Sequence, residues 1–185
     1  MTAMNRTDLV RQMAAYNQWM NDKLLLAAAR LDPAALAADR QAFFGSILRT
    51  LNHLVIADTI WLQRFARHPA THAALDPVRA LPAPDFADLE RFTDLPALAA
   101  HRRWLDALIV GWAESVAEPD LDVTLHYANS RGAVSDKNFF GLLAHFFNHQ
   151  THHRGQVTTL LSQAGVDVGV TDLLALLPEQ GQGQG

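Results

Sequence analysis

Apolar residues recur at spacings of three and four along most of this 185-residue chain, which is the period of an amphipathic helix. The pattern predicts four long helices, over residues 7–31, 41–67, 95–116 and 136–163. Proline and glycine separate these blocks, and a short helical piece is expected at residues 33–39. Four long amphipathic helices in one small domain predict an all-α fold, a four-helix bundle.

The connections between the helices carry different signals. Residues 68–84 hold four prolines and predict an irregular surface crossing. Residues 121–132 alternate like a strand and end in a turn signal, so a small hairpin that includes Ala133 and Val134 is expected between the third and fourth long helices. Asp136 is the expected N-cap of the last helix.

The end of the chain follows the same reasoning. Gly165 is expected to stop the last helix, and one more helical turn is expected within residues 168–177. The Gly/Gln repeats at 179–185 have nothing to bury and are expected to be disordered. The chain therefore reads as one bundle domain, residues 1–178, with a short tail.

Composition narrows the classes of function. Apolar residues make up 49% and charged residues 18% of the chain, and the net charge is -4, which fits a globular domain and argues against a nucleic-acid binder. The chain has no cysteine, so disulfides, thiolate metal sites and a cysteine nucleophile are excluded. With no apolar run of about 18 residues and no signal-peptide pattern at the N-terminus, we expect a cytoplasmic protein that does not enter membranes.

Histidine is the most informative residue type. Four of nine histidines crowd together at His145, His149, His152 and His153. At about 100° per residue, His149 and His153 border the apolar face of their helix, whereas His145 and His152 lie nearer its rim. Two histidines four residues apart on one helix can bind a single metal ion.

His53 is the best candidate for a third ligand, because it lies in an apolar stretch of the second long helix. A core histidine bonded to a backbone carbonyl is the alternative. Asp58 follows five residues later, about 140° round the helix, so it is a poor ligand candidate. We expect it to form a surface or inter-helix salt bridge with Arg49 or Arg64.

Several residues near the histidine cluster have two readings. Gln156 lies beside His149 on the helical wheel and is either a hydrogen-bonding group of the site or an exposed polar residue. Arg154 points away and is expected at the surface or an interface. A mid-helix glycine, Gly155, suggests close approach of another helix within the chain or across a dimer.

Phe140 and Phe147 lie opposite His149 on their helix. They either pack within the chain or form a helix–helix seam between two copies, since small bundles often cover excess apolar surface in this way. We expect a homodimer on this basis.

Three segments of the chain together resemble the DinB family of damage-inducible proteins, within the DinB/YfiT-like bundle superfamily. They are AAYNQWMNDKLL (14–25), FGSILRTLNHLVIADTIWLQRF (44–65) and HFFNHQTHHRGQV (145–157). The resemblance implies a four-helix bundle with an unusual connection order and a divalent metal held by His53, His149 and His153. The family's aromatic and polar positions near the N-terminus match four residues whose alternative role is helix packing: Tyr16, Asn17, Trp19 and Asn21.

Three neutral imidazoles leave an ion its full charge and open coordination positions, so the ion can activate water or bind a thiol as thiolate. Zinc suits an all-histidine set best, and nickel, iron and manganese also accept imidazole. The resemblance implies metal-dependent transferases and isomerases that use low-molecular-weight thiols. Because the chain lacks cysteine, the sulfur must come from a cosubstrate.

Two hypotheses follow from these observations. The first is a metal-dependent enzyme, a thiol transferase or hydrolase, acting on a small molecule. No catalytic group is assigned, and His145, His152 and Gln156 are candidates for groups that surround the metal ligands and form hydrogen bonds with them. The second is a non-catalytic, metal-stabilised dimeric bundle or interaction module, in which a fourth ligand such as His145 closes the coordination sphere.

Overall fold

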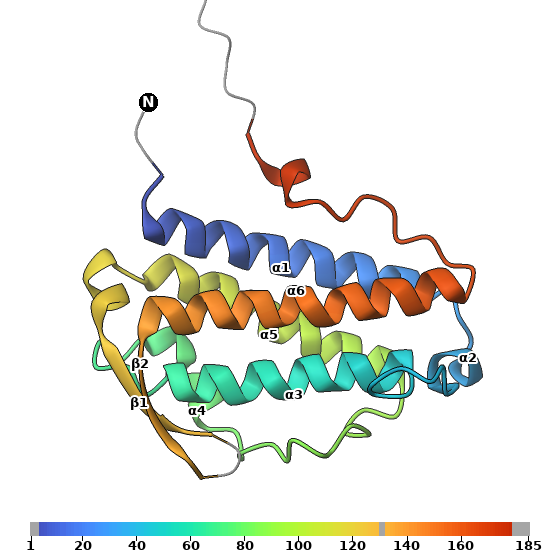
Figure 1. Ribbon diagram of the computed structural model, residues 1–185, viewed down its shortest axis with the longest axis horizontal. Coiled ribbons are helices and arrows are strands. Elements are labelled where there is room, and N and C mark those ends of the chain that lie inside the picture. Colours follow the sequence, from blue (N-terminus) through green and yellow to red (C-terminus); the bar gives the residue numbers. More distant parts are fainter. Residues whose placement is uncertain (1–3, 130–131, 179–185) are drawn as a thin grey trace, which may run out of the picture.

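Four long helices dominate the structure, a computed structural model that describes residues 4–129 and 132–178. They are α1 (Arg6–Ala28), α3 (Ile47–Phe65), α5 (Leu95–Ser115) and α6 (Phe139–Gln163), and they lie side by side along the long axis (Figure 1). The predicted all-α bundle is therefore confirmed. The predicted tail, 179–185, lies outside the described residues.

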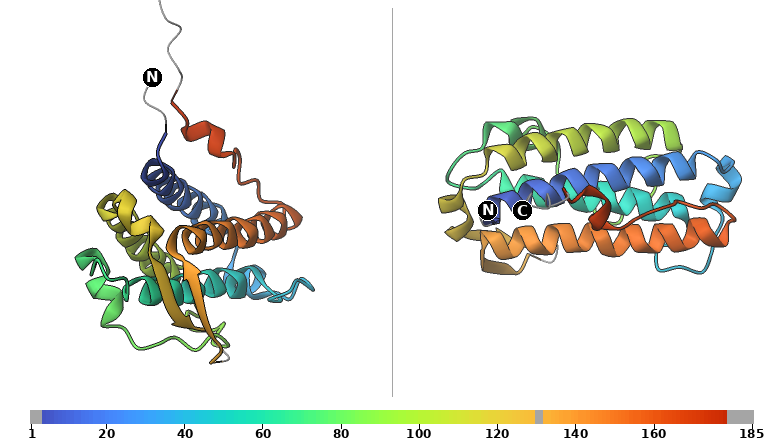
Figure 2. Two further views of the ribbon diagram at one scale, coloured as in Figure 1. Left: turned by 60° about the vertical axis from the view of Figure 1, so that its left-hand side comes forward. Right: turned by 90° about the horizontal axis from the view of Figure 1, so that it is seen from above.

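The helices pack around the bundle in the order α1, α5, α3, α6, which the views in Figure 2 make visible. α1 and α6 run in one direction, and α3 and α5 run in the other (Figure 1). Residues 66–94 make this possible, because they carry the chain back along the whole bundle between α3 and α5. α3 and α5, which follow one another along the chain, are therefore parallel neighbours in the bundle.

This crossing is less irregular than its prolines predict. It contains the 3₁₀ turn η1 (Ala73–Leu75) and the short helix α4 (Asp76–Arg79). Pro77 lies in the first turn of α4, where the missing N–H has no intrahelical partner to lose. Leu75 and Val78 are buried against the core, so the crossing is anchored at that end.

The second long helix begins later than the prediction of residue 41. The short helix α2 (Pro33–Ala37) precedes a loop, and α3 starts after Ser46, whose side chain accepts a hydrogen bond from the Arg49 backbone N–H (3.2 Å). Gln41 and Gly45 both have positive φ angles, 56° and 82°, which a helix excludes. Phe43, which continues the apolar spacing of the predicted helix, is 85% exposed in this loop.

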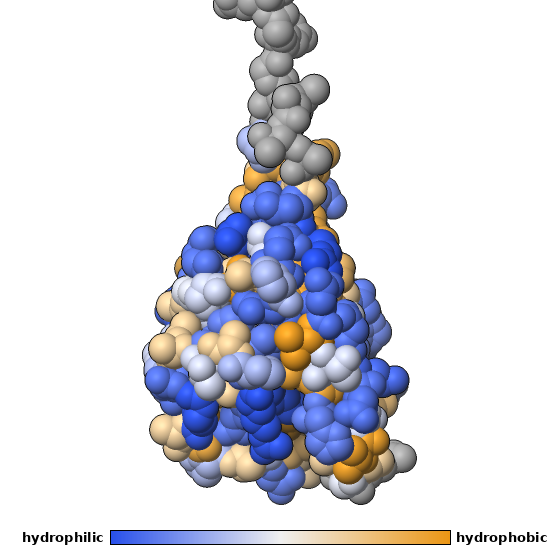
Figure 3. Space-filling view, turned by 90° about the vertical axis from the view of Figure 1, so that its left-hand side faces the viewer, coloured by the Kyte–Doolittle hydropathy of each residue, from blue (hydrophilic) through white to orange (hydrophobic). Residues whose placement is uncertain are grey.

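The predicted hairpin is present, as β1 (Thr124–Ala128) and β2 (Val134–Asn138) in an antiparallel pair. It follows the 3₁₀ helix η2 (Glu118–Asp122) and leads directly into α6. Residues 130 and 131 of the predicted turn lie outside the described residues. Figure 3 shows the end of the molecule on the left of Figure 1, which is largely hydrophilic with scattered apolar residues.

The N-cap of α6 is Asn138, not Asp136. The Asn138 side chain accepts from the Gly141 backbone N–H (3.0 Å) and donates to the Leu121 carbonyl (3.0 Å). Asp136 lies within β2, where it pairs with His126 (2.8 Å). Strand pairing continues through Asn138, so the helix cannot begin earlier.

The chain turns back after α6. Gly165, with φ at 78°, follows the end of α6 as predicted, and the 3₁₀ turn η3 (Leu173–Leu176) lies within the expected 168–177 segment. This segment runs back past α1 (Figure 1). It is held there by Tyr16, whose hydroxyl donates to the Thr171 carbonyl at 2.6 Å.

The core has two apolar clusters. One surrounds the stacked rings of Phe65 and Trp112 (5.3 Å) near the hairpin, and the other surrounds Leu24 and Leu98 near α2. Between them lies a layer of buried polar side chains, which we call the polar layer: Asn17, Asn21, Asp58, Arg102, Asp106, Gln150 and Arg154. None of the described helices is long and apolar enough to span a membrane.

Candidate metal centre

Three histidine rings meet between α3 and α6. His53 comes from the middle of α3, and His149 and His153 come from successive turns of α6. The Nε2 atom of His53 lies 3.3 Å from that of His149 and 3.2 Å from that of His153, and the last two are 3.0 Å apart. Among the described residues, these three form the group that could hold a metal ion.

The geometry fits a cation of zinc size. A tetrahedral ion at ~2.1 Å from each imidazole nitrogen needs nitrogens ~3.4 Å apart, close to the spacings found. Burial lowers the pKa of His53 to about 3 and that of His149 to about 4, and neighbouring histidines add to both shifts. The imidazoles are therefore neutral near pH 7, the protonation state that metal binding requires.

Gln156 fixes the orientation of His153. The Gln156 carbonyl oxygen lies 2.8 Å from His153 Nδ1, and because that oxygen can only accept, Nδ1 carries the proton and Nε2 keeps its lone pair. The wheel placed Gln156 beside His149, whereas its contact is with His153. The Gln156 amide nitrogen is also 3.4 Å from His152 Nε2.

His145 and His152 stay outside the group. Both side chains are exposed, as the helical wheel predicts. The His145 ring centre lies 6.0 Å from that of His149, and the His152 ring centre lies 4.8 Å from that of His153. Neither belongs to the set of donor atoms that could share one ion.

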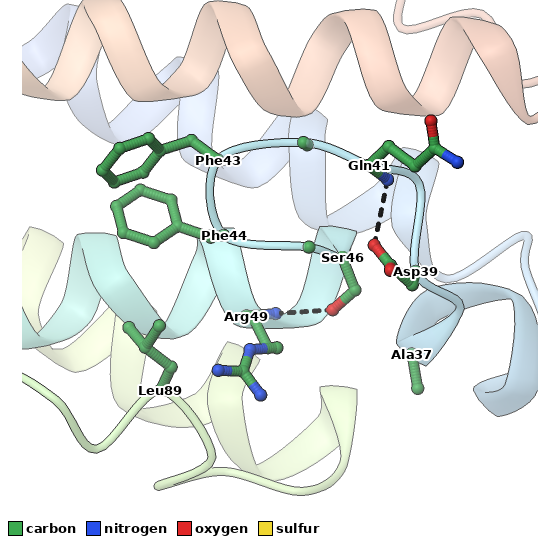
Figure 4. A pocket seen from close by; sticks show the side chains of 10 residues that line it. Ala37, Asp39, Gln41, Phe43, Phe44, Ser46, Arg49 and Leu89 are labelled. Atoms are coloured by element: carbon green, nitrogen blue, oxygen red, sulfur yellow. Dashed lines mark hydrogen bonds between the residues drawn. The ribbon is translucent and has the colours of Figure 1, made fainter.

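Aromatic rings cover His53 on the outer side. Phe44 stacks on His53 with ring centres 4.1 Å apart, and Phe86 meets the same ring edge-on at 5.3 Å. Both come from loops rather than helices. Figure 4 shows Phe43 and Phe44 side by side at the tip of their loop, on the rim of a pocket of about 560 Å³ that Arg49 and Leu89 also line.

The polar layer lies directly behind the histidines. Gln150 lies between His149 and His153 on α6, and its amide donates to Asp58 Oδ2 (2.9 Å). Asp58 forms an ion pair with Arg102 of α5, which also pairs with Asp106 (2.8 Å). Burial raises the pKa of Asp58, and Arg102 opposes that shift.

The expected salt bridge of Asp58 is therefore of the inter-helix kind, and its two expected partners are wrong. Asp58 is buried, and Arg49, one of its two expected partners, pairs with Glu90 instead (2.7 Å). The other, Arg64, stacks on aromatic rings. The side chain faces α5 across the bundle, a neighbour that the helical wheel of α3 alone does not reveal.

α1 completes the layer with amide groups. Asn17 and Asn21 each donate to Asp106 Oδ1, at 3.0 and 2.9 Å. Burial raises the pKa of Asp106 to about 6, opposed by Arg102 and Asn21. Asn17 and Asn21, two of the four N-terminal positions that match the DinB family pattern, thus belong to the polar layer.

Arg154 is a further correction, because it is 2% exposed rather than at the surface. Its guanidinium donates to Asn17 Oδ1 and lies over the Tyr16 ring, 5.3 Å from the centre. Position 154 is one turn beyond Gln150 and shares its inward direction. Trp19 is partly buried beside Tyr16, and Lys23 lies over its ring at 4.9 Å.

Comparison with known proteins agrees with this architecture. The sequence profile of the DinB family matches residues 3–183. The chain belongs to the DinB family. One similar protein is "Protein DinB" of Bacillus subtilis (strain 168), which is 25% identical over 166 residues, covering 90% of this chain and 92% of that protein. No solved structure gives a significant match.

One expectation for this DinB-family chain concerns Gly155. A Cβ atom placed there would meet nothing within 4 Å among the described residues, so the expected close approach of another helix within the chain is wrong. Contact across a dimer stays a prediction. Phe140 and Phe147 line an apolar groove of about 340 Å³ between α1 and α6.

Sequence reasoning missed two sets of residues. Arg102 and Asp106 are four residues apart on one helix, a spacing typical of an ion pair, and this signal was available. Phe44 and Phe86 carried no such signal, because they lie in loops that hydrophobic periodicity does not describe.

Proposed function

We propose that this DinB-family protein is a metal-dependent enzyme that acts on a small molecule by thiol transfer or hydrolysis. The convergence of three neutral imidazoles carries the proposal, because no fourth donor among the described residues joins them. A zinc-type site with three protein ligands retains a position for water or substrate. The bound ion would supply Lewis acidity for activating water or a thiol.

The residues around the site support this role. Gln156 keeps the Nε2 lone pair of His153 directed at the shared centre, and Phe44 and Phe86 cover the His53 ring. Zinc suits the donor set best, with nickel, iron and manganese as alternatives. Since the chain has no cysteine, a thiol reaction would use a low-molecular-weight thiol as cosubstrate.

Metal analysis combined with activity assays tests the proposal. Purified protein, dialysed without chelator, should contain close to one equivalent of metal, and His53→Ala and His149→Ala should each lose it. His152→Ala is the matched control, because His152 is exposed on the same helix and should keep the metal. Turnover would be measured with cysteine or glutathione plus an activated haloaromatic compound, and with 4-nitrophenyl acetate for hydrolysis.

Two results would overturn the enzyme proposal. One is wild-type protein that takes up no metal even when zinc is supplied. The other is metal-loaded protein whose turnover of every substrate in these assays equals that of His53→Ala. Metal uptake without turnover would favour the second candidate.

The second candidate is a non-catalytic, metal-stabilised dimer. The apolar groove between α1 and α6 favours it, because Leu9 is 38% exposed there and Met13 and Phe140 are only partly buried, whereas Phe147 is buried within the chain. Light scattering would give twice the mass of one chain if this groove is a dimer seam. A single-chain mass at a protein concentration of about 100 µM, roughly 100 times a micromolar dissociation constant, would exclude it.

A further inference from the structure

A second cavity lies beside the histidines, where the hairpin packs against α3 and α6. Its volume is about 460 Å³, within the usual range for a small-molecule site. It draws on α3, α6 and both strands of the hairpin, and its lining residues are Trp61, Tyr127, Lys137, Asn138, Gly141, Leu142 and His145. The function proposed above uses none of these residues as a metal ligand.

Aromatic rings form the walls of the cavity. The Trp61 ring centre lies 5.5 Å from that of Tyr127 and 5.1 Å from that of His145. His145 is in turn 6.0 Å from His149, measured between ring centres. The cavity therefore adjoins the metal centre, and its walls suit a flat apolar group.

The charge at this cavity is positive. Lys137 lines it, opposite the buried Leu125 in the hairpin register. The Arg64 guanidinium lies behind the walls, 4.5 Å from the centre of the Trp61 ring and 5.1 Å from that of Tyr127. Among the described residues, neither cation has a carboxylate within ion-pair distance.

Acidic groups do not offset this charge. Asp136 is next to Lys137 in sequence, but its side chain points to the other face of the strand and pairs with His126 (2.8 Å). Burial lowers the pKa of Arg64, and Arg67 adds to that shift, as expected for a cation with no compensating carboxylate. A ligand with a negative charge would supply the missing partner.

We propose that this cavity binds the carboxylate end of a small aromatic substrate. The substrate's ring would pack against Trp61 and Tyr127, and its carboxylate would pair with Lys137. This orientation leaves the remainder of the molecule beside His145, facing the three histidines. The inference rests on the proposed function for its reacting centre, whereas the binding itself does not require the metal.

Ligand titrations on the metal-free full chain test this inference, since removing the metal prevents direct coordination of the carboxylate. The probes are 3-phenylpropionate and its neutral amide, followed through the Trp61 indole N–H resonance, which Trp61→Phe assigns. The carboxylate should shift this resonance. In Lys137→Gln its Kd should rise about fivefold to tenfold, the loss expected for a charge-assisted contact.

The chain offers a matched control, because its other lysine, Lys23, lies over the Trp19 ring on α1 and does not line this cavity. Lys23→Gln removes the same charge and should change the Kd less than about twofold, as expected for a distant screened charge. Arg64→Gln, a second variant in which the lost charge comes from α3, should also weaken binding. Equal affinity for the amide and the carboxylate, or equal effects of the two lysine variants, would overturn the inference.

Metal analysis of the same samples separates the two proposals. Protein that binds zinc normally but shows no dependence on Lys137 would contradict only the carboxylate site. Protein that binds the carboxylate through Lys137 but takes up no zinc would contradict only the metal-dependent function.

Discussion

Burial decides the protonation of the histidines that face one another. In an unfolded chain a histidine has a pKa of about 6.5, whereas burial lowers the pKa of His53 to about 3 and that of His149 to about 4. The folded, metal-free protein therefore binds fewer protons than the unfolded chain throughout the range between these values. Its stability must fall as the pH falls below about 6.5.

We expect the metal-free protein to lose about 2 kcal/mol of unfolding free energy between pH 7 and pH 5 from these two residues, after allowing for partial exposure to solvent. Urea unfolding in the presence of a chelator measures this loss. The double variant His53→Gln, His149→Gln should show a shallower pH dependence, and His152→Gln should match the wild type. Parallel curves for the double variant and the wild type would contradict the assigned pKa shifts.

The inward direction of the histidines could be predicted from one helix at a time, but the partners of the polar residues around them could not. The wheel placed His149 and His153 on the inward border, and the structure brings both against His53. It failed for Asp58 and Arg154, because their partners, Arg102 and Asn17, lie on helices whose order around the bundle the sequence pattern does not specify.

The loop before α3, residues 38–46, contributes more to the centre than a simple connection would. Left-handed backbone at Gln41 and Gly45 turns the chain so that Phe44 lies flat on His53 while Phe43 points to solvent. The Phe43 ring meets Phe44 edge-on, with ring centres 4.8 Å apart, and of the two it is Phe44 that stacks on His53. The loop shields one side of the metal centre, and substitution of Phe43 can be compared with substitution of Phe44.

We expect Phe44→Ala to weaken metal binding about tenfold, the usual loss when a residue that supports a ligand is removed. Competition with a chromophoric chelator gives the affinity. Phe43→Ala should leave the affinity within about twofold, since its exposed ring contacts Phe44 rather than His53 and exposed side chains usually contribute little. If both variants bind metal as the wild type does, the stacked ring has no part in holding His53.

This loop also explains why α3 begins later than the apolar pattern predicts. Ala42, Phe43 and Phe44 continue the apolar pattern of the helix, so periodicity extended the prediction to residue 41. The cap at Ser46 and the positive φ at Gly45 decide the boundary instead. Serine N-caps and glycines with positive φ are common at helix ends, so the sequence carries a signal for this boundary. That signal is weaker than the apolar pattern.

Metal binding and folding are coupled for the molecule as a whole, because the ligands come from two helices separated by about half the chain. Zinc at about 100 times its Kd should add about 2.7 kcal/mol to the folded state, which corresponds to about 5–10 °C in Tm for a domain of this size. Calorimetry with and without zinc measures the shift. His53→Gln should abolish it, and an unchanged wild-type Tm would argue against a site that forms only on folding.

The fold class could be predicted from the sequence, but hydrophobic periodicity does not predict the order of the helices around the bundle. Four apolar stripes predict four helices, but the same stripes fit several orders around a bundle. The order α1, α5, α3, α6 depends on residues 66–94 running the full length of the molecule. A proline-rich stretch indicates a connection without indicating where it leads.

The polar layer has a consequence for how this bundle can change. Gln150 reaches Asp58 from a position between two candidate ligands, so sliding α6 along α3 by one turn would leave buried charges without partners, at a cost of several kcal/mol. The polar layer in the middle of the bundle therefore determines how α6 is aligned along α3. Insertions, deletions or repacking at either end can accumulate without moving the imidazoles out of reach of one another.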